Sequence, residues 1–145
     1  MKPINEMKLC FASRSCNESF ARSAVTAFIA VLDPNVEEIS DIKTAVSEAV
    51  TNCIVHGYRD GIGKVYIHVK IFEGARVSIN IRDKGCGISD IKKAMEPLYT
   101  TCETGERAGL GFSIMDSFMD KLKVRSNPGR GTSVTLEKSI VSKGK

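Results

Sequence analysis

Two polar residues, Glu48 and Asn52, stand one helical turn apart in a segment whose apolar residues recur at helical spacing. At about 100° per residue from Ile42, they fall near −120° and −80°, beside an apolar stripe at roughly −20° to +40°. A carboxylate and a carboxamide so placed can act on one ligand, because an amide oxygen suits a hard cation such as Mg²⁺ and a carboxylate can accept a proton. The same pattern fits a solvated helix edge, so the pair alone leaves both interpretations open.

A second candidate, Asp83, ends a segment in which apolar and polar residues alternate. Its parity is that of the apolar positions from Val77 to Ile81, so strand geometry directs this carboxylate into the apolar layer. A buried carboxylate is costly unless it is hydrogen-bonded, and a ligand amino group would satisfy it. Gly85 and Gly87 permit positive φ and let a flat group approach the backbone. An ordinary Asp-Gly turn at a strand end is the alternative.

A third candidate is Gly109-Leu110-Gly111, which we expect to open a helix after a loop rich in Thr, Gly and Arg. Glycines there leave backbone N–H groups near the positive end of the helix dipole, which suits a phosphate. Arg107 can add charge-assisted hydrogen bonds to a terminal phosphate. A glycine-rich hinge would have the same composition.

Two widespread phosphate-binding motifs are absent from the sequence. Before Gly63-Lys64 the Walker pattern needs a glycine where Tyr58 stands, and it needs Ser or Thr in place of Val65. Gly85-x-Gly87 lacks the third glycine of a dinucleotide fingerprint, because position 90 is Asp. Neither P-loop nor Rossmann binding is supported.

The elements that must position these residues are of both kinds, as judged from apolar periods of 3.6 and of 2. A capping box over Ser15–Glu18 and a stop at Asp33-Pro34 bracket the first helix. Helices covering one face of a mixed, mostly antiparallel sheet form an α+β two-layer sandwich. We expect strands at 9–12, 65–72, 77–81, from 124 and at 132–136, with helices at 20–32, 36–55, 90–96 and from 111; 97–107 is expected to be a loop.

Composition places the chain among globular proteins. With 145 residues, 42% apolar and 26% charged, it suits one domain spanning 1–145 and excludes disorder. No apolar run approaches a membrane span and no signal peptide opens the chain, so we expect a cytoplasmic protein without membrane contact. The odd count of five cysteines favours free thiols. Residues 121–145 carry seven basic and one acidic residue, a net +6, but no aromatic stacking pattern, so direct nucleic-acid binding is not expected.

In this order the motifs resemble those of the GHKL ATPase/kinase superfamily, whose nucleotide-binding domain has the Bergerat fold. Four boxes match, and together they are specific although each is weak alone. They are Glu48-Ala-Val-Thr-Asn52 with His56-Gly57, Asp83-Lys-Gly85-Cys-Gly87-Ile88, Gly109-Leu-Gly111-Phe112 and Gly129-Arg-Gly131-Thr132.

The resemblance extends to the anti-sigma serine kinases of spore-forming bacteria, over almost the whole chain. It implies a homodimer that binds and silences the sporulation sigma factor F and uses ATP and Mg²⁺ to phosphorylate a serine of an anti-anti-sigma partner. The segments that carry it, besides the first box, are Asn17-Glu-Ser-Phe-Ala-Arg22, Pro97-Leu-Tyr-Thr-Thr101 and Gly111-Phe-Ser-Ile-Met-Asp-Ser-Phe-Met-Asp120.

The same resemblance assigns a role to each candidate residue. Asp83 would accept from the adenine amino group, Asn52 would coordinate Mg²⁺, and Glu48 would take the proton of the attacking serine. Arg107 would steady the γ-phosphate, while Arg22 would meet the protein partners. The remaining nucleotide contacts would come from Gly85, Gly87, Thr101, Gly109, Leu110, Gly111 and Thr132, of which Gly109 and Gly111 donate N–H groups and Thr132 reaches adenine through its hydroxyl or a water.

Three alternatives remain at this point. Other GHKL enzymes join this fold to further domains or to a helix with a phosphoacceptor His, and the two histidines here, His56 and His68, stand on no separate helix. A protein that only sequesters sigma, with nucleotide as a structural ligand, would need Asp83 and the glycines but not Glu48. A related kinase could serve a stress-response sigma factor.

Overall fold

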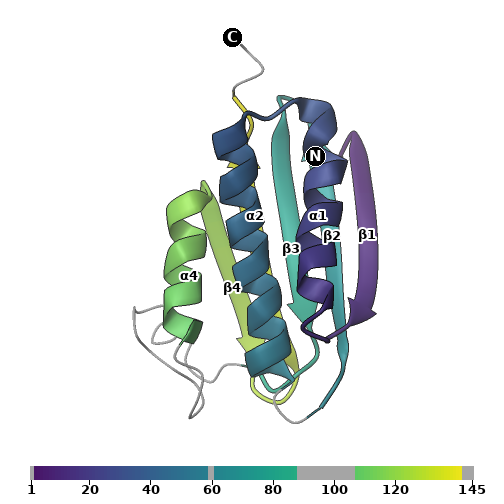
Figure 1. Ribbon diagram of the computed structural model, residues 1–145, viewed down its shortest axis with the longest axis vertical. Coiled ribbons are helices and arrows are strands. Elements are labelled where there is room, and N and C mark those ends of the chain that lie inside the picture. Colours follow the sequence, from purple (N-terminus) through teal and green to yellow (C-terminus); the bar gives the residue numbers. More distant parts are fainter. Residues whose placement is uncertain (1, 59–60, 88–106, 142–145) are drawn as a thin grey trace.

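The computed structural model describes residues 2–58, 61–87 and 107–141. Within them, five strands form one sheet in the order β1-β2-β3-β5-β4, and each of the four pairings is antiparallel. Helices α1, α2 and α4 lie on one face of this sheet, with α2 between the other two (Figure 1). The two-layer α+β sandwich expected from the sequence is therefore confirmed. The strands are β1 (Asn5–Ala12), β2 (Lys64–Phe72), β3 (Arg76–Asp83), β4 (Lys121–Asn127) and β5 (Gly131–Ser139).

Strands β2 and β3 form the hairpin that their alternation predicts. Every second residue, from Val65 to Ile71 and from Val77 to Asp83, is buried against the helices, and the residues between them are more exposed. Val65 lies opposite Asp83 at the open end of the hairpin. The connecting turn holds Gly74 and Ala75 at φ values of 83° and 60°. Strand β1 begins at Asn5, four residues before the predicted start, because residues 5–8 contain a single apolar residue, Met7, which is too few to show an alternation.

Strand β5 reaches its place by a detour. The chain leaves β3, returns through α4 to the sheet edge as β4, and turns back so that β5 inserts between β3 and β4. This insertion sets Thr132 beside Asp83. The basic residues Lys121, Lys123 and Arg125 are exposed along β4, where charged side chains discourage further strand pairing.

Helix α1 (Asn17–Ile29) continues as a 3₁₀ turn, η1 (Ala30–Leu32), and ends where Asp33 adopts a left-handed φ of 55°. The predicted capping box over Ser15–Glu18 is wrong, since the N-cap is Cys16 and no side chain caps the helix. The amide of Asn17 instead donates to the carbonyl of Ala12 at 2.9 Å. Position 18 is thus one place too early for the box.

Helix α2 (Val36–Thr51) carries a capping box that the sequence analysis missed. Asn35 accepts from the N–H of Glu38 at 2.7 Å, and Glu38 accepts from the N–H of Asn35 at 2.9 Å. The helix then continues as a π-helical turn, η2 (Asn52–Gly57), so the predicted end near residue 55 is nearly right although the backbone there is not α-helical. Such π turns concentrate at functional sites.

Helix α4 (Arg107–Phe118) begins four residues before the predicted start. The helix expected at 90–96 lies outside the described residues. So does the loop expected at 97–107, except for Arg107, which belongs to α4. Within the described part of the chain, no helix combines the length and apolar character needed to cross a membrane. The core between helices and sheet includes Ala21, Val25, Ile29, Ile42, Val46, Val50, Ile67, Ile79, Ile81, Met115 and Leu136.

Candidate functional site: a pocket between the helices and the sheet

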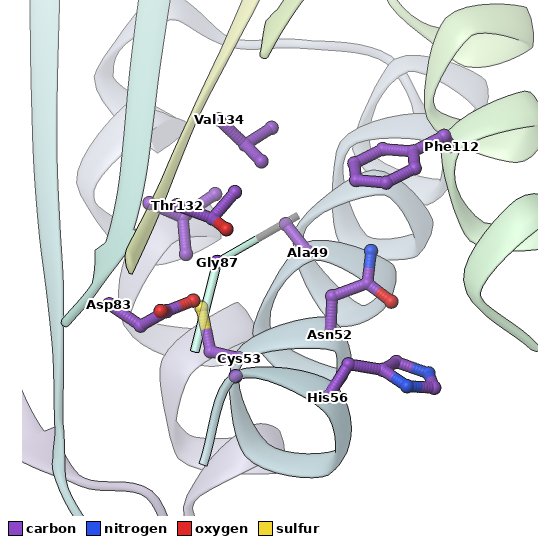
Figure 2. A pocket seen from close by; sticks show the side chains of 11 residues that line it. Ala49, Asn52, Cys53, His56, Asp83, Gly87, Phe112, Thr132 and Val134 are labelled. Atoms are coloured by element: carbon purple, nitrogen blue, oxygen red, sulfur yellow. The ribbon is translucent and has the colours of Figure 1, made fainter. Parts of the chain in front are cut away.

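A pocket opens where the ends of α2 and β3 meet the starts of α4 and β5 (Figure 2). Its walls are mostly apolar, and its polar groups come from both layers of the sandwich. Such a cavity, with few polar groups among apolar ones, is typical of small-molecule sites. Its lining comprises Ala49, Asn52, Cys53, His56, Gly57, Ile81, Asp83, Gly87, Phe112, Thr132 and Val134.

Asp83 lies in the sheet wall of this pocket with only 4% of its surface exposed. Its Oδ1 accepts from the N–H of Gly85 at 2.8 Å, and its carboxylate also accepts from the Cys53 thiol and the N–H of Thr132. Burial raises the pKa of Asp83, and these three hydrogen bonds oppose that rise. Figure 2 shows the Cys53 sulfur beside the carboxylate. The prediction that Asp83 points inward is confirmed.

Gly57 and Gly85 let the helix end approach the end of β3. A Cβ on Gly57 would lie 2.8 Å from Asp83 Oδ2, and a Cβ on Gly85 would collide with the carbonyl of Gly57. The same carbonyl accepts from the N–H of Cys86 at 2.8 Å. Backbone from the two layers is therefore in direct contact around the carboxylate, which only glycine at both positions allows.

Gly87 turns the chain away from the sheet at a φ of 77°, a value that side chains rarely adopt. A Cβ there would collide with the carbonyl of Asn127. The loop is held from the other side as well, because Gly129 donates its N–H to the carbonyl of Cys86 at 2.6 Å. The first and last glycine boxes thus pack against each other.

Glu48 and Asn52 face the beginning of α4. A Cβ on Gly111 would lie 3.2 Å from Glu48 Oε1 and 3.5 Å from both polar atoms of the Asn52 side chain. Glu48 is 9% exposed, so the pair is not a solvated helix edge. The Asn52 Nδ2 atom is buried and has no hydrogen-bond partner among the described residues. Glu48, which is not among the lining residues, and the Asn52 carboxamide, which is, therefore meet where α2 faces the start of α4, beside the pocket, as the helical spacing predicted.

Thr132 completes the sheet side. It lies opposite Asp83 in the β3–β5 ladder, and its hydroxyl is 2.9 Å from that of Ser126. Its side chain lines the pocket next to the carboxylate. The Thr132 hydroxyl would therefore lie close to a ligand amino group that is bound by Asp83.

Other predicted site residues lie elsewhere or are only partly described. Arg22 stands on α1, away from the pocket, and pairs with Glu18 at 3.5 Å. Arg107, Gly109 and Leu110 belong to the first turn of α4, whose N–H groups lack helical acceptors, but their side chains are outside the described part. Thr101 lies outside the described residues altogether.

Several pocket residues were not among the predicted site residues. Cys53 and Ala49 belong to the apolar stripe of α2, and Val134 shares the parity of Thr132, so the periodicity alone places them on the pocket side. Gly57 belongs to the first box, but the sequence assigned it no role of its own in the site. Its contact with Asp83 joins residues distant in sequence, and no local signal indicates it.

The comparisons with known proteins agree with this geometry. Residues 12–138 match the family model of the histidine kinase-like ATPase domain. The RsbU and RsbW domains of Rv1364c from Mycobacterium tuberculosis share the fold, with a TM-score of 0.68 at 16% identity over 95% of this chain and 33% of that chain. The histidine kinase domain of Erythrobacter litoralis EL346 gives 0.57 at 18% identity, covering 88% and 63%. The fold and pocket are thus those of a histidine kinase-like ATPase.

Closer relatives narrow this class. The chain is 56% identical over 142 residues to the anti-sigma F factor of Thermoanaerobacter sp. (strain X514), covering 98% of this chain and 99% of that protein. It is 55% identical over 139 residues to that of Halalkalibacterium halodurans, covering 94% and 93%. The chain belongs to the anti-sigma F factor family, serine kinases built on this ATPase domain. The predicted family and enzyme class are confirmed.

Proposed function

We propose that residues 1–145 form a single kinase domain that binds and inhibits sigma factor F and phosphorylates a serine of an anti-anti-sigma protein with ATP. Family membership and the pocket support this proposal. We further propose that it acts as a homodimer in the cytoplasm. The observation that carries the nucleotide part is the buried carboxylate of Asp83, which faces a mostly apolar pocket.

In this proposal the adenine base occupies the apolar part of the pocket. Its amino group donates a hydrogen bond to the Asp83 carboxylate. This bond adds to those from the neighbouring protein groups and further offsets the cost of burying the charge. Phe112 and Val134 supply apolar surface for the ring. Thr132 offers its hydroxyl next to the carboxylate, directly or through a water.

The phosphates then extend along the start of α4. Backbone N–H groups of Gly109, Leu110 and Gly111, together with Arg107, are proposed to stabilise the negative charge there. Gly85, Gly87 and Thr101 are proposed as further nucleotide contacts. The absence of a side chain at Gly111 leaves room between α4 and the Glu48–Asn52 pair.

The residues at this end of the pocket fit Mg²⁺. The buried Nδ2 of Asn52 has no hydrogen-bond partner among the described residues, so its nitrogen does not hold this carboxamide in place, and its oxygen is the kind of ligand that Mg²⁺ prefers. When bound, the ion would neutralise phosphate charge and orient the terminal phosphate. We propose Asn52 as its protein ligand.

Glu48 is proposed as the general base. As the serine oxygen attacks the γ-phosphorus, its proton passes to the Glu48 carboxylate, the bond to the β,γ-bridging oxygen breaks, and ADP leaves. Because Glu48 is almost fully buried, bulk water has little access to compete with its carboxylate for that proton. Arg107 steadies the transferring phosphoryl group in this scheme.

Two other functions compete with this one. A related kinase serving a stress-response sigma factor would have the same pocket, but the homology to anti-sigma F factors favours sigma F. A protein that sequesters sigma without kinase activity would have no use for a buried carboxylate at Glu48, and the family is one of kinases. Arg22 on the exposed side of α1 is our proposed contact with both protein partners.

The test is Glu48→Gln, which keeps the shape of the side chain but removes its basicity. We expect serine phosphorylation of the anti-anti-sigma protein to fall at least about 100-fold, as the loss of a general base implies. Affinity for ADP should stay within about threefold, because the base does not contact adenine in this scheme. Radiolabelled ATP and calorimetry measure the two quantities. Undiminished phosphorylation by this variant would show that Glu48 is not the general base.

A further inference from the structure

The phenol of Tyr58 joins three segments just outside the pocket. Its hydroxyl accepts a hydrogen bond from the N–H of Lys84 at 2.7 Å and donates one to the carbonyl of Lys64 at 2.7 Å. Lys84 follows Asp83 at the end of β3, Lys64 begins β2, and Tyr58 itself follows η2. One hydroxyl therefore links the helix layer to the ends of two neighbouring strands.

These two hydrogen bonds stand where the next rung of the β2–β3 ladder would be. The ladder ends at the pair Val65–Asp83, so Lys64 and Lys84 would form the following pair. The phenol oxygen takes the place of a direct bond between their backbones. It thereby ends the pairing directly after Asp83 and frees the chain to turn toward Gly57.

The tyrosine is itself held firmly. Its ring packs on Gly63, where any Cβ would collide with ring carbons, and its N–H donates to the carbonyl of Cys53 at 3.1 Å. Burial raises the pKa of Tyr58, so the hydroxyl keeps its proton and remains a donor to Lys64 near neutral pH. The bridge is thus anchored at the backbone, the ring and the hydroxyl.

The position of Lys84 is transmitted to the carboxylate over a short path. The N–H of Gly85 donates to Asp83 Oδ1 at 2.8 Å, and the N–H of Cys86 donates to the carbonyl of Gly57 at 2.8 Å. A shift of Lys84 would move Gly85 and with it the carboxylate that this N–H orients. Tyr58 is not among the residues that line the pocket.

We propose that Tyr58 is a positioning residue for base recognition, whose hydroxyl aims Asp83 at the amino group of adenine without contacting the nucleotide. The inference rests on the proposed function, because it takes Asp83 as the adenine contact. It predicts that losing the hydroxyl weakens recognition of the amino group specifically.

The experiment compares two nucleotides by calorimetry with the full chain and Mg²⁺: ADP, and purine riboside 5′-diphosphate, which lacks the amino group. For Tyr58→Phe we expect affinity for ADP to fall about threefold to tenfold, the range that one hydrogen bond gives. Affinity for the analogue should stay within about twofold of the wild-type value. A tyrosine that merely stabilises the fold would lower both affinities equally, and that result would overturn the inference.

A double-mutant cycle separates this inference from the proposed function. If Asp83→Asn alone leaves the preference for ADP unchanged, the adenine contact is wrong and the positioning role falls with it. If Asp83→Asn abolishes the preference but Tyr58→Phe does not reduce it, only the positioning role is wrong. We expect Tyr58→Phe to have no further effect on the preference in the Asp83→Asn background.

Two further variants guard the interpretation. Tyr66→Phe is the matched control: Tyr66 stacks its ring near Arg82 and Lys84 on the outer sheet face, a contact that phenylalanine retains, so both affinities should be unchanged. Should Tyr58→Phe not fold, Gly63→Ala takes its place in the experiment. The added Cβ would collide with the Tyr58 ring and displace it. An undiminished preference for ADP in folded Gly63→Ala would then count against the inference.

Discussion

At the scale of single residues, the site depends on a carboxylate whose burial disfavours its charge. The pKa of Asp83 is raised by burial, and hydrogen bonds from Gly85, Cys53 and Thr132 limit the rise. In the unbound protein this charge is therefore tolerated rather than stabilising. In the proposed function the amino group of adenine adds a further donor, so a group that is costly to bury can serve recognition.

This residue gives a pH prediction. Because the pKa of Asp83 is higher in the folded than in the unfolded chain, the folded state binds the proton more tightly, so Asp83 contributes less stability as pH rises from about 3.8 through the raised value. Asp83→Asn removes that titration. We expect the free energy of unfolding of the nucleotide-free wild type, relative to this variant, to decrease from pH 4 to pH 7. Urea titrations at several pH values measure it, and a difference that does not vary with pH would contradict the assignment.

At the scale of elements, α4 packs on α2 at Gly111, a residue that lowers the stability of the helix but leaves space for the proposed functional side chains. A glycine inside a helix costs up to about 1 kcal/mol relative to alanine. Here it leaves space beside Glu48 and Asn52, because an added Cβ would come within 3.2 Å of the carboxylate. The element is therefore less stable than its sequence could make it, at the place where the two polar groups need room.

Gly111→Ala should separate the two effects. We expect the free energy of unfolding to stay constant or rise by up to about 1 kcal/mol, while the kinase rate falls at least about tenfold because the catalytic pair is displaced. Urea unfolding and a phosphorylation assay measure these. The control is Ser117→Ala, an exposed position of the same helix, which should leave the rate unchanged. A fully active Gly111→Ala would show that the close approach has no catalytic role.

At the scale of the whole molecule, the pocket spans both layers of the sandwich, so a ligand there must bind the folded state alone. MgADP at 100 times its Kd should add about 2.7 kcal/mol to the free energy of unfolding, roughly a 10 °C rise in Tm. Removal of the metal with EDTA should reduce this rise, since Asn52 would lose its link to the phosphates. Thermal scans test both, with Lys123→Gln on the outer face as the control. An equal rise in Tm with and without Mg²⁺ would show that the metal does not contribute to nucleotide binding.

Much of this arrangement follows from local sequence. Alternation predicted β2 and β3 and the inward direction of Asp83, and helical spacing predicted the pairing of Glu48 with Asn52. Those features depend on the hydrophobic period of a single element, which can be read directly from the sequence. The resemblance to GHKL proteins added the family, which the comparisons confirm.

The rest depends on contacts between distant segments. Gly57 has the appearance of a helix stop, yet its missing side chain is required by Asp83. Tyr58 has no local reason to be a tyrosine, and its partners Lys64 and Lys84 become evident only when the strands are aligned. Tertiary contacts decided these positions. The capping box expected at Ser15 failed for a local reason, because Cys16 is the N-cap and Glu18 is therefore not the third residue of the helix.

The insertion of β5 between β3 and β4 has a consequence for biosynthesis. Strand β5, which supplies Thr132, leaves the ribosome after the other four described strands, whereas Asp83 emerges much earlier. A nascent chain that already contains its acidic residue still lacks the opposite wall of the cavity. Cellular ATP should therefore be unable to hold such a chain in its final shape, and nucleotide binding should begin only after β5 has been synthesised.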